Sequence, residues 1–216
     1  APALILAGVA QMRVRSAYQK ASRMPASSGL TGAQAARMLL DRDGLQGVGI
    51  EESHGMLSDH YDPRAKVLRL SQDVYHGRSL AALGIAAHEA GHALQDHHGY
   101  APLRIRNGIV PLASIGGNGA MILFMIGLVL NFAGLIYIAI ALFSGVVLFQ
   151  LVNLPVEFDA SARAKRLLAG TGMIAGPEEG EVRKVLSAAA LTYVAATLSA
   201  ILTLAYFLIR AASARQ

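Results

Sequence analysis

The chain has 216 residues, of which 54% are hydrophobic and only 15% are charged, and its formal net charge is +5. With a mean hydropathy of +0.44 and long stretches free of charge, it does not have the composition of an ordinary soluble domain and is typical of a membrane protein. The absence of cysteine excludes disulfides and thiolate metal sites, and the basic excess, which lacks a basic aromatic motif, fits cytoplasmic loops better than a nucleic-acid partner.

Residues 1–10 are apolar but too few to cross a bilayer, which takes about 20 helical residues. We expect them to be the remaining end of an N-terminal transmembrane helix, or else a membrane-surface anchor. A cleaved signal peptide is not favoured, because the positive charges follow the apolar run instead of preceding it. By the positive-inside rule these charges place the next segment in the cytoplasm. They are Arg13, Arg15, Lys20 and Arg23.

A loop and one packing helix are predicted next. Residues 24–30 form the loop, as their Pro, Ser and Gly content indicates. Thr31 caps a helix over residues 32–43 with one buried apolar face, and Gly44 ends it.

Short strands follow, because the pattern changes to an alternation of polar and apolar residues. The predicted strands are residues 47–51, a segment near Met56 and Leu57, and residues 66–70. A turn is predicted over residues 59–63, with Pro63 as the breaker. The last strand either completes an ordinary sheet or offers an edge to which an extended peptide substrate adds as a further strand.

The predicted helix over residues 79–97 carries the sequence His-Glu-Ala-Gly-His at positions 88–92. His88 and His92 lie about 40° apart on a helical wheel, so both imidazoles can bind a single Zn²⁺. Glu89 lies beside them, where a carboxylate can act as general base toward a water whose pKa the metal lowers to about 7. Small uncharged residues surround the motif, as expected for a helix packed in a protein core. The pattern therefore indicates one zinc ion per chain.

Residues 107–156 contain no charged side chain. Fifty helical residues would span about 75 Å against a hydrocarbon core of about 30 Å, so two crossings and a turn fit better than one crossing. We predict a hairpin of membrane helices over residues 110–130 and 133–152, joined at Asn131–Phe132. A further uncharged run predicts a C-terminal membrane helix over residues 186–209.

A third metal ligand must come from another part of the chain. A membrane hairpin returns the chain to the face it left, which makes Glu157 and Asp159 available and puts 17 of the 19 Lys and Arg residues in the cytoplasm. His98 competes, because it has the spacing of the third histidine in another group of zinc proteases. That spacing needs a glycine at which the chain leaves the helix, and Gln95 stands there. In a continuous helix His98 lies about 80° from the first histidine, so geometry favours Glu157.

Four stretches of the sequence together resemble the YugP-type neutral zinc metallopeptidases of bacterial membranes. They are residues 57–63 (Leu-Ser-Asp-His-Tyr-Asp-Pro), 86–95 (Ala-Ala-His-Glu-Ala-Gly-His-Ala-Leu-Gln), 100–106 and 154–164. A more distant resemblance is to the HtpX and CAAX prenyl protease gluzincins, in which a Glu-x-x-x-Asp motif follows a membrane hairpin. That resemblance implies Glu157 as the third zinc ligand. In this chain Ser161 stands at the Asp position of that motif. We therefore expect Ser161, Asp159 or Arg163 to form the hydrogen bonds that orient the zinc ligands.

We therefore expect an α+β, mainly α-helical fold that forms a single membrane metallopeptidase domain over residues 1–216. Its expected parts are the partial N-terminal membrane helix 1–10, the catalytic part 11–106 with the active helix 79–97, the membrane hairpin 110–130 and 133–152, the third-ligand segment 155–184 and the C-terminal membrane helix 186–209. The expected location is the bacterial inner membrane, with several crossings and the active site on the cytoplasmic side.

The expected function is hydrolysis of peptide bonds in a peptide or membrane-protein substrate. His88, His92 and Glu157 would bind the zinc, and Glu89 would activate the water. Candidates for holding the oxyanion are His60, Tyr61 and Arg163. Two alternatives stay open: an intramembrane protease with Asp159 as the acidic ligand, and a metal-binding membrane scaffold without hydrolysis.

Overall fold

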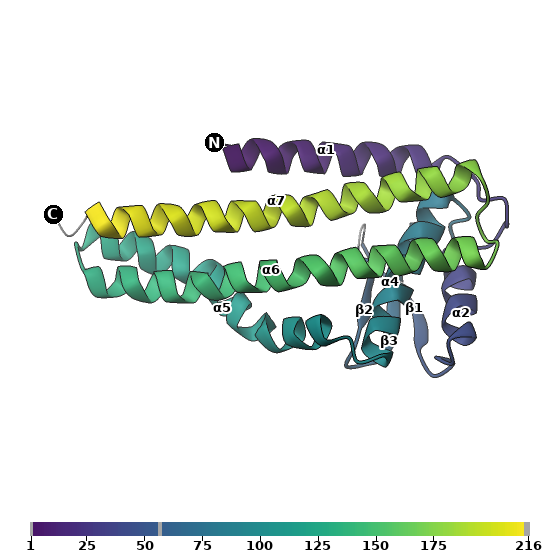
Figure 1. The fold of residues 1–216 in the computed structure, drawn as a ribbon, viewed down its shortest axis with the longest axis horizontal. Helices are drawn as coiled ribbons and strands as arrows, with labels where there is room; N and C mark the ends of the chain where they lie inside the picture. Colours follow the sequence, from purple (N-terminus) through teal and green to yellow (C-terminus); the bar gives the residue numbers. More distant parts are fainter. Residues whose placement is uncertain (1, 56–57, 214–216) are drawn as a thin grey trace. The chain divides into compact units, whose positions relative to one another are not determined.

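The computed structural model of the protein describes residues 2–55 and 58–213 (Figure 1). These residues are mainly helical and include one small sheet, as the sequence indicates. In chain order the elements are α1 (Pro2–Ser22), α2 (Gly32–Arg42), β1 (Gly49–Ser53), β2 (His60–Asp62), β3 (Val67–Ser71), α3 (Gln72–Tyr75), α4 (Leu80–His97), α5 (Ala101–Val129), α6 (Ala133–Gly170) and α7 (Pro177–Ser213).

The chain divides into two compact units. The helical unit comprises residues 1–8, 101–155 and 193–216, and the mixed unit comprises residues 9–100 and 156–192. Helices α1, α6 and α7 contribute to both units, because the boundaries fall within them. The mixed unit contains the three predicted metal ligands, and the helical unit contains the predicted membrane hairpin.

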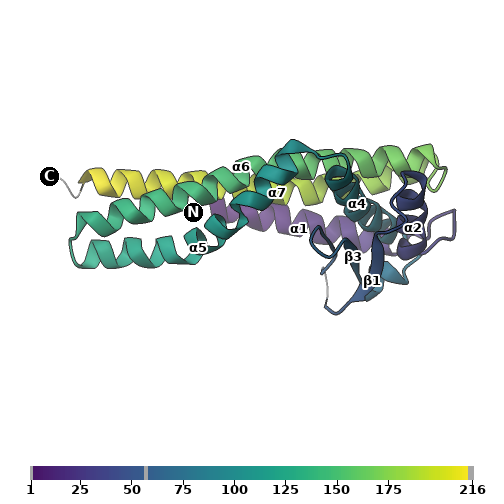
Figure 2. The same ribbon diagram turned by 90° about the horizontal axis from the view of Figure 1, so that it is seen from below.

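The sheet of the mixed unit has the strand order β1-β3-β2 and lies beside α4 (Figure 2). β1 runs parallel to β3, with Ile50 opposite Leu68, and β2 runs antiparallel to β3, with Tyr61 opposite Leu68. Leu68 and Leu70 are fully buried, whereas Arg69 between them is partly exposed. This alternation puts one face of the sheet into the core.

The structure corrects one prediction in this region. The predicted turn over residues 59–63 is wrong, because His60–Asp62 forms β2 and the turn follows it. Tyr61 is buried in the core and pairs with Leu68, a contact between separate strands that local turn composition does not reveal. The strands predicted over residues 47–51 and 66–70 are confirmed with shifts of one or two residues. The strand predicted near Met56 and Leu57 lies outside the described residues.

Helix α2 begins and ends as its sequence predicts. The Thr31 hydroxyl accepts the N–H of Gln34 at 3.2 Å, and the Gln34 side chain accepts the N–H of Thr31 at 2.9 Å, which makes a capping box. Gly44 follows the helix with a φ of 79°, a conformation that favours glycine. The face of α2 that packs against α4 is fully buried and consists of Ala35, Ala36, Leu39 and Leu40.

Helix α4 closely matches the helix predicted over residues 79–97. The hydroxyl of Ser79 caps it by accepting the N–H of Ala82 at 3.2 Å. Its alanines are fully buried among the side chains of the mixed unit, so the prediction that this helix packs inside a protein core is confirmed. They include Ala86, Ala87, Ala90 and Ala93.

The predicted hairpin forms in the helical unit. Helices α5 and α6 are joined by residues 130–132, and Asn131 has a φ of 49° in this turn. The two helices approach closely at Gly116, where an added Cβ would lie 2.6 Å from the carbonyl oxygen of Leu142. In the same unit the ring of Phe124 stacks on Phe207 of α7, with 3.8 Å between ring centroids. Small and aromatic residues thus hold α5, α6 and α7 together.

Helix α6 is longer than predicted. It does not end near residue 152 but passes through Pro155 and continues to Gly170. Beyond the proline a row of residues spaced four apart is fully buried, and this packing compensates for the hydrogen bond that the proline cannot make. The row consists of Val156, Ala160, Ala164 and Leu168.

Three helices among the described residues are long and apolar enough to cross a membrane. They are α5, α6 and α7, with mean hydropathies of 1.9, 2.5 and 1.9 over their most apolar windows. Helices α6 and α7 include the predicted segments 133–152 and 186–209 and extend beyond them, whereas α5 begins before the predicted segment 110–130 and ends one residue short of it.

The close approach at Gly116 predicts the effect of a single methyl group. Gly116→Ala should lower the free energy of unfolding by about 1–3 kcal/mol, because the new Cβ meets a backbone carbonyl that cannot move aside. Gly119→Ala in the same helix should be neutral or stabilising, since nothing lies within 4 Å of its Cβ position. Unfolding of both variants in detergent by circular dichroism measures the difference, and equal stability would contradict the packing.

Candidate metal centre

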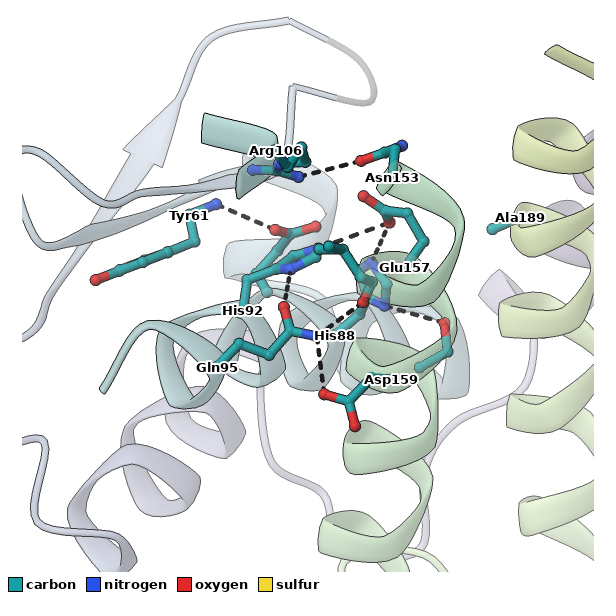
Figure 3. A network of polar contacts seen from close by, with 12 residues as sticks. Tyr61, His88, His92, Gln95, Arg106, Asn153, Glu157, Asp159 and Ala189 are labelled. Atoms are coloured by element: carbon teal, nitrogen blue, oxygen red, sulfur yellow. Dashed lines mark hydrogen bonds and ion pairs between the residues drawn. The ribbon is translucent and has the colours of Figure 1, made fainter. Parts of the chain in front are cut away.

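Three side chains of the mixed unit converge on one point. His88 and His92 project from the same face of α4, and Glu157 projects from α6, directly after Val156, the first residue of the fully buried row. Glu157 Oε2 lies 3.3 Å from His88 Nε2 and 3.6 Å from His92 Nε2, and all three ligand atoms lie within 4.8 Å of one another (Figure 3). The side chains are between 5% and 13% exposed. A buried set of two imidazoles and one carboxylate is therefore assembled from two helices.

This donor set fits a zinc ion. Zinc binds His nitrogen and carboxylate oxygen at about 2.0–2.2 Å in tetrahedral geometry, which separates neighbouring donor atoms by about 3.3–3.6 Å. The two distances from the Glu157 oxygen to the histidine nitrogens lie in that range. Two neutral imidazoles and one carboxylate leave a fourth position free, the arrangement found in catalytic zinc sites.

Glu89 lies next to these ligands. The residue is 8% exposed, and its Oε2 accepts the backbone N–H of Tyr61 at 3.1 Å. The pKa of Glu89 is raised to about 7, mainly by burial. The Glu157 and Asp59 charges contribute to this rise, whereas His88 and the Tyr61 N–H oppose it. A carboxyl group with this pKa can both take up and release a proton at neutral pH.

Each histidine of the cluster has a partner for its second ring nitrogen. The hydroxyl of Ser161 lies 3.2 Å from His88 Nδ1. Ser161 stands at the Asp position of the Glu-x-x-x-Asp motif, so the residue at that position does contact a predicted zinc ligand. The side chain of Gln95 lies 2.9 Å from His92 Nδ1. The sequence analysis considered Gln95 only as the residue at the position where His98 would need a glycine in order to reach the metal. The contact of Gln95 with His92 was missed, although residues three apart on a helix are neighbours, so the spacing was a signal for it.

Gly91 explains how the two helices come close enough. A Cβ atom at this position would lie 2.8 Å from the carbonyl oxygen of Ala160 in α6, closer than side-chain carbons approach other atoms. Glycine on one helix and alanine on the other therefore let the backbones of α4 and α6 touch. Glu157 stands one turn before Ala160, so this contact determines whether its carboxylate reaches the histidines.

The side chains of Tyr61 and His60, which the sequence predicts near the metal, contact groups other than the three ligands. The Tyr61 hydroxyl donates to Asp96 at 2.7 Å and points away from the histidines, so Tyr61 meets Glu89 through its backbone (Figure 3). His60 is exposed, and its Nδ1 lies 2.8 Å from the carbonyl oxygen of Ser58. An oxyanion role for Tyr61, His60 or Arg163 stays a prediction.

Asp159 and His98, the two competitors of Glu157, lie in a separate network. Asp159 accepts hydrogen bonds from Arg163 Nε at 2.6 Å and from Gln95 Nε2 at 2.9 Å. His98 follows the last residue of α4, and its Nδ1 lies 3.3 Å from Arg163 Nη1. Among the described residues the group that can hold a metal contains Glu157 and neither competitor.

Comparison with known proteins agrees with this geometry. The sequence pattern of the family described as "Putative neutral zinc metallopeptidase" matches residues 1–212, so the chain belongs to that family. The chain is also 49% identical over 205 residues to the "Putative membrane protease YugP" of Bacillus subtilis (strain 168), an alignment that covers 95% of this chain and 91% of the relative. No solved structure matches it. The resemblance expected from the sequence motifs is thereby confirmed.

The helix contact at Gly91 predicts that a methyl group weakens the metal site. Gly91→Ala should lower zinc affinity by about 10- to 100-fold, because α6 must move away and carry Glu157 with it. Gly84→Ala on the same helix is the control, since its Cβ would meet only a movable methyl group of Val182 at 3.3 Å. Zinc competition with a chromophoric chelator measures both, and unchanged affinity in Gly91→Ala would contradict this role of the contact.

Proposed function

We propose that the chain is a membrane-bound zinc endopeptidase in which His88, His92 and Glu157 bind one zinc ion and Glu89 is the general base. The single observation that carries this proposal is the convergence of the three ligand atoms within 4.8 Å, directly beside a buried carboxyl group. The family to which the chain belongs and the printed name of its Bacillus relative support a protease. The substrate is a peptide or a membrane protein.

The chain's own residues supply the proton transfers. A zinc ion bound here would act as a Lewis acid, which lowers the pKa of a water and polarises the scissile carbonyl. Glu89 accepts the proton of the attacking water and passes it to the leaving amine. The Tyr61 N–H engages Oε2 of Glu89, so we assign the proton transfers to Oε1. The raised pKa of Glu89 suits this double task, because the group must be a base first and an acid afterwards.

The membrane part of the proposal rests on α5, α6 and α7. Large apolar side chains are exposed on these helices and in the turn between α5 and α6, among them Ile115, Val129 and Leu130 at 66%, 79% and 65%. Such surfaces are stable against lipid but not against water. We propose several crossings of a bacterial inner membrane, with the active site on the cytoplasmic side, because 17 of the 19 Lys and Arg residues then lie in the cytoplasm.

The contacts of Asp159 disfavour the intramembrane alternative. Asp159 Oδ2 already accepts hydrogen bonds from Arg163 and Gln95, and among the described residues Asp159 is not part of the group that can hold a metal. Glu157, in contrast, already lies 3.3 Å from His88 Nε2 and 3.6 Å from His92 Nε2.

Replacing Glu89 by Gln separates catalysis from metal binding. Glu89→Gln should lower hydrolysis of a quenched peptide library by about 100-fold or more, because the amide cannot accept the proton of water. Bound zinc should remain near one per chain, since Glu89 is not a ligand. Glu179→Gln, outside the site, should keep both. Retained hydrolysis in Glu89→Gln would contradict the assignment, and loss of zinc would make Glu89 a ligand instead.

The proposed topology can be tested by cysteine labelling, because the natural chain contains no cysteine. Leu130→Cys at the hairpin turn and Ala212→Cys near the end of α7 should react with a membrane-impermeant maleimide added outside the inner membrane. Arg166→Cys should react only after the membrane is opened. Reaction of Arg166→Cys from outside would place the third-ligand segment on the wrong side and contradict the proposed orientation.

A further inference from the structure

Gln95 is buried in a way that is costly unless every polar atom of its amide is satisfied. It is 0% exposed and ranks in size with the fully buried Leu and Phe side chains of the protein. An unbonded amide group in such a place destabilises a protein by about 1–3 kcal/mol. The hydrogen bonds of Gln95 therefore restrict its orientation strongly.

The donor end of the amide is fixed by helix α6. Nε2 donates to the carbonyl oxygen of Val156 at 2.8 Å and to Asp159 Oδ2 at 2.9 Å. A backbone carbonyl accepts only, and the Asp159 oxygen is held as an acceptor by Arg163 Nε at 2.6 Å. Both partners thus require the NH₂ group, and the amide cannot be turned over without losing two hydrogen bonds.

The acceptor end then fixes the histidine. Oε1 of Gln95 lies 2.9 Å from His92 Nδ1, and because Oε1 can only accept, Nδ1 must carry the proton. A neutral imidazole protonated on Nδ1 has its lone pair on Nε2, the nitrogen that faces Glu157 at 3.6 Å. His88 differs, because the Ser161 hydroxyl on its Nδ1 can either donate or accept and so specifies no tautomer by itself.

We propose that Gln95 is a positioning residue of the zinc site, which holds His92 in its metal-binding tautomer and fastens α4 to the turn of α6 that carries Glu157. The proposal deepens the proposed function and rests on it. Val156 and Asp159 flank Glu157 in sequence, so one side chain restrains both a histidine ligand and the backbone beside the carboxylate ligand. The Arg163–Asp159 pair holds the far end of this chain of hydrogen bonds.

The test compares the wild-type protein with the Gln95→Met variant, both in detergent. Methionine keeps the shape of the side chain and removes all three hydrogen bonds. Zinc affinity, measured by competition with a chelator, should fall by about 10- to 100-fold. The absorption spectrum of the cobalt-substituted protein should change, because His92 is free to rotate. Ser71→Ala, which removes another buried hydrogen-bonding side chain of the mixed unit, should leave affinity and spectrum as they are.

A second measurement does not depend on zinc binding. In the metal-free protein at pH about 9, where free imidazoles are neutral, ¹⁵N NMR should show His92 protonated on Nδ1, and Gln95→Met should give a mixture of tautomers. A wild-type chain that shows this tautomer but binds no zinc would overturn the proposed function and leave the role of Gln95 toward His92 intact. A His92 protonated on Nε2 in the wild type would overturn the inference.

Zinc affinity within twofold of wild type in Gln95→Met, with an unchanged cobalt spectrum, would also overturn it. If Gln95→Met does not fold, Asp159→Asn tests the same chain of hydrogen bonds from its partly exposed end. The neutral amide holds Gln95 less firmly, so zinc affinity should fall several-fold, and an unchanged affinity would again contradict the proposal.

Discussion

The structure depends on the contact between the backbone of α4 at Gly91 and that of α6 at Ala160. The two histidines and the glutamate stand 69 and 65 residues apart in sequence, yet their ligand atoms must come within a few ångströms of one another. A single added methyl group at Gly91 would keep the helices apart. Close packing of small residues therefore has a chemical purpose here, since it sets the size of a site that fits a zinc ion.

Other parts of the mixed unit hold the chemistry in place around this contact. The sheet brings the Tyr61 N–H to Glu89, and Gln95 binds His92 on one side and α6 on the other. The core that supports these groups comes from α2, α4 and the buried row of α6, so most of the apolar side chains near the site are structural. The hydrogen bonds to ligands are few, and the one to His92 is directed by an amide oxygen that can only accept.

Much of the fold could be predicted from local sequence signals. Thr31 and Ser79 cap the helices they were expected to cap, and the charge-free runs predict the hairpin and its turn at Asn131. The choice of Glu157 over His98 followed from helical geometry, and the structure brings Glu157 to the histidines. The turn predicted in place of β2 and the early end predicted for α6 were wrong, because pairing with β3 and burial beyond Pro155 are long-range effects. The contacts of Gln95 with Val156 and Asp159 of α6 could not be predicted, since these partners lie 61 and 64 residues away in sequence.

Metal analysis of three purified proteins shows directly whether Glu157 or Asp159 is the third zinc ligand. We predict about one zinc per chain in the wild type, none above background in Glu157→Ala, and about one at saturating zinc in Asp159→Asn. This result would assign the third ligand to Glu157 of α6, one turn before the residue that packs against Gly91. Full zinc in Glu157→Ala together with its loss in Asp159→Asn would contradict the account, because the metal would then lie at a different part of α6.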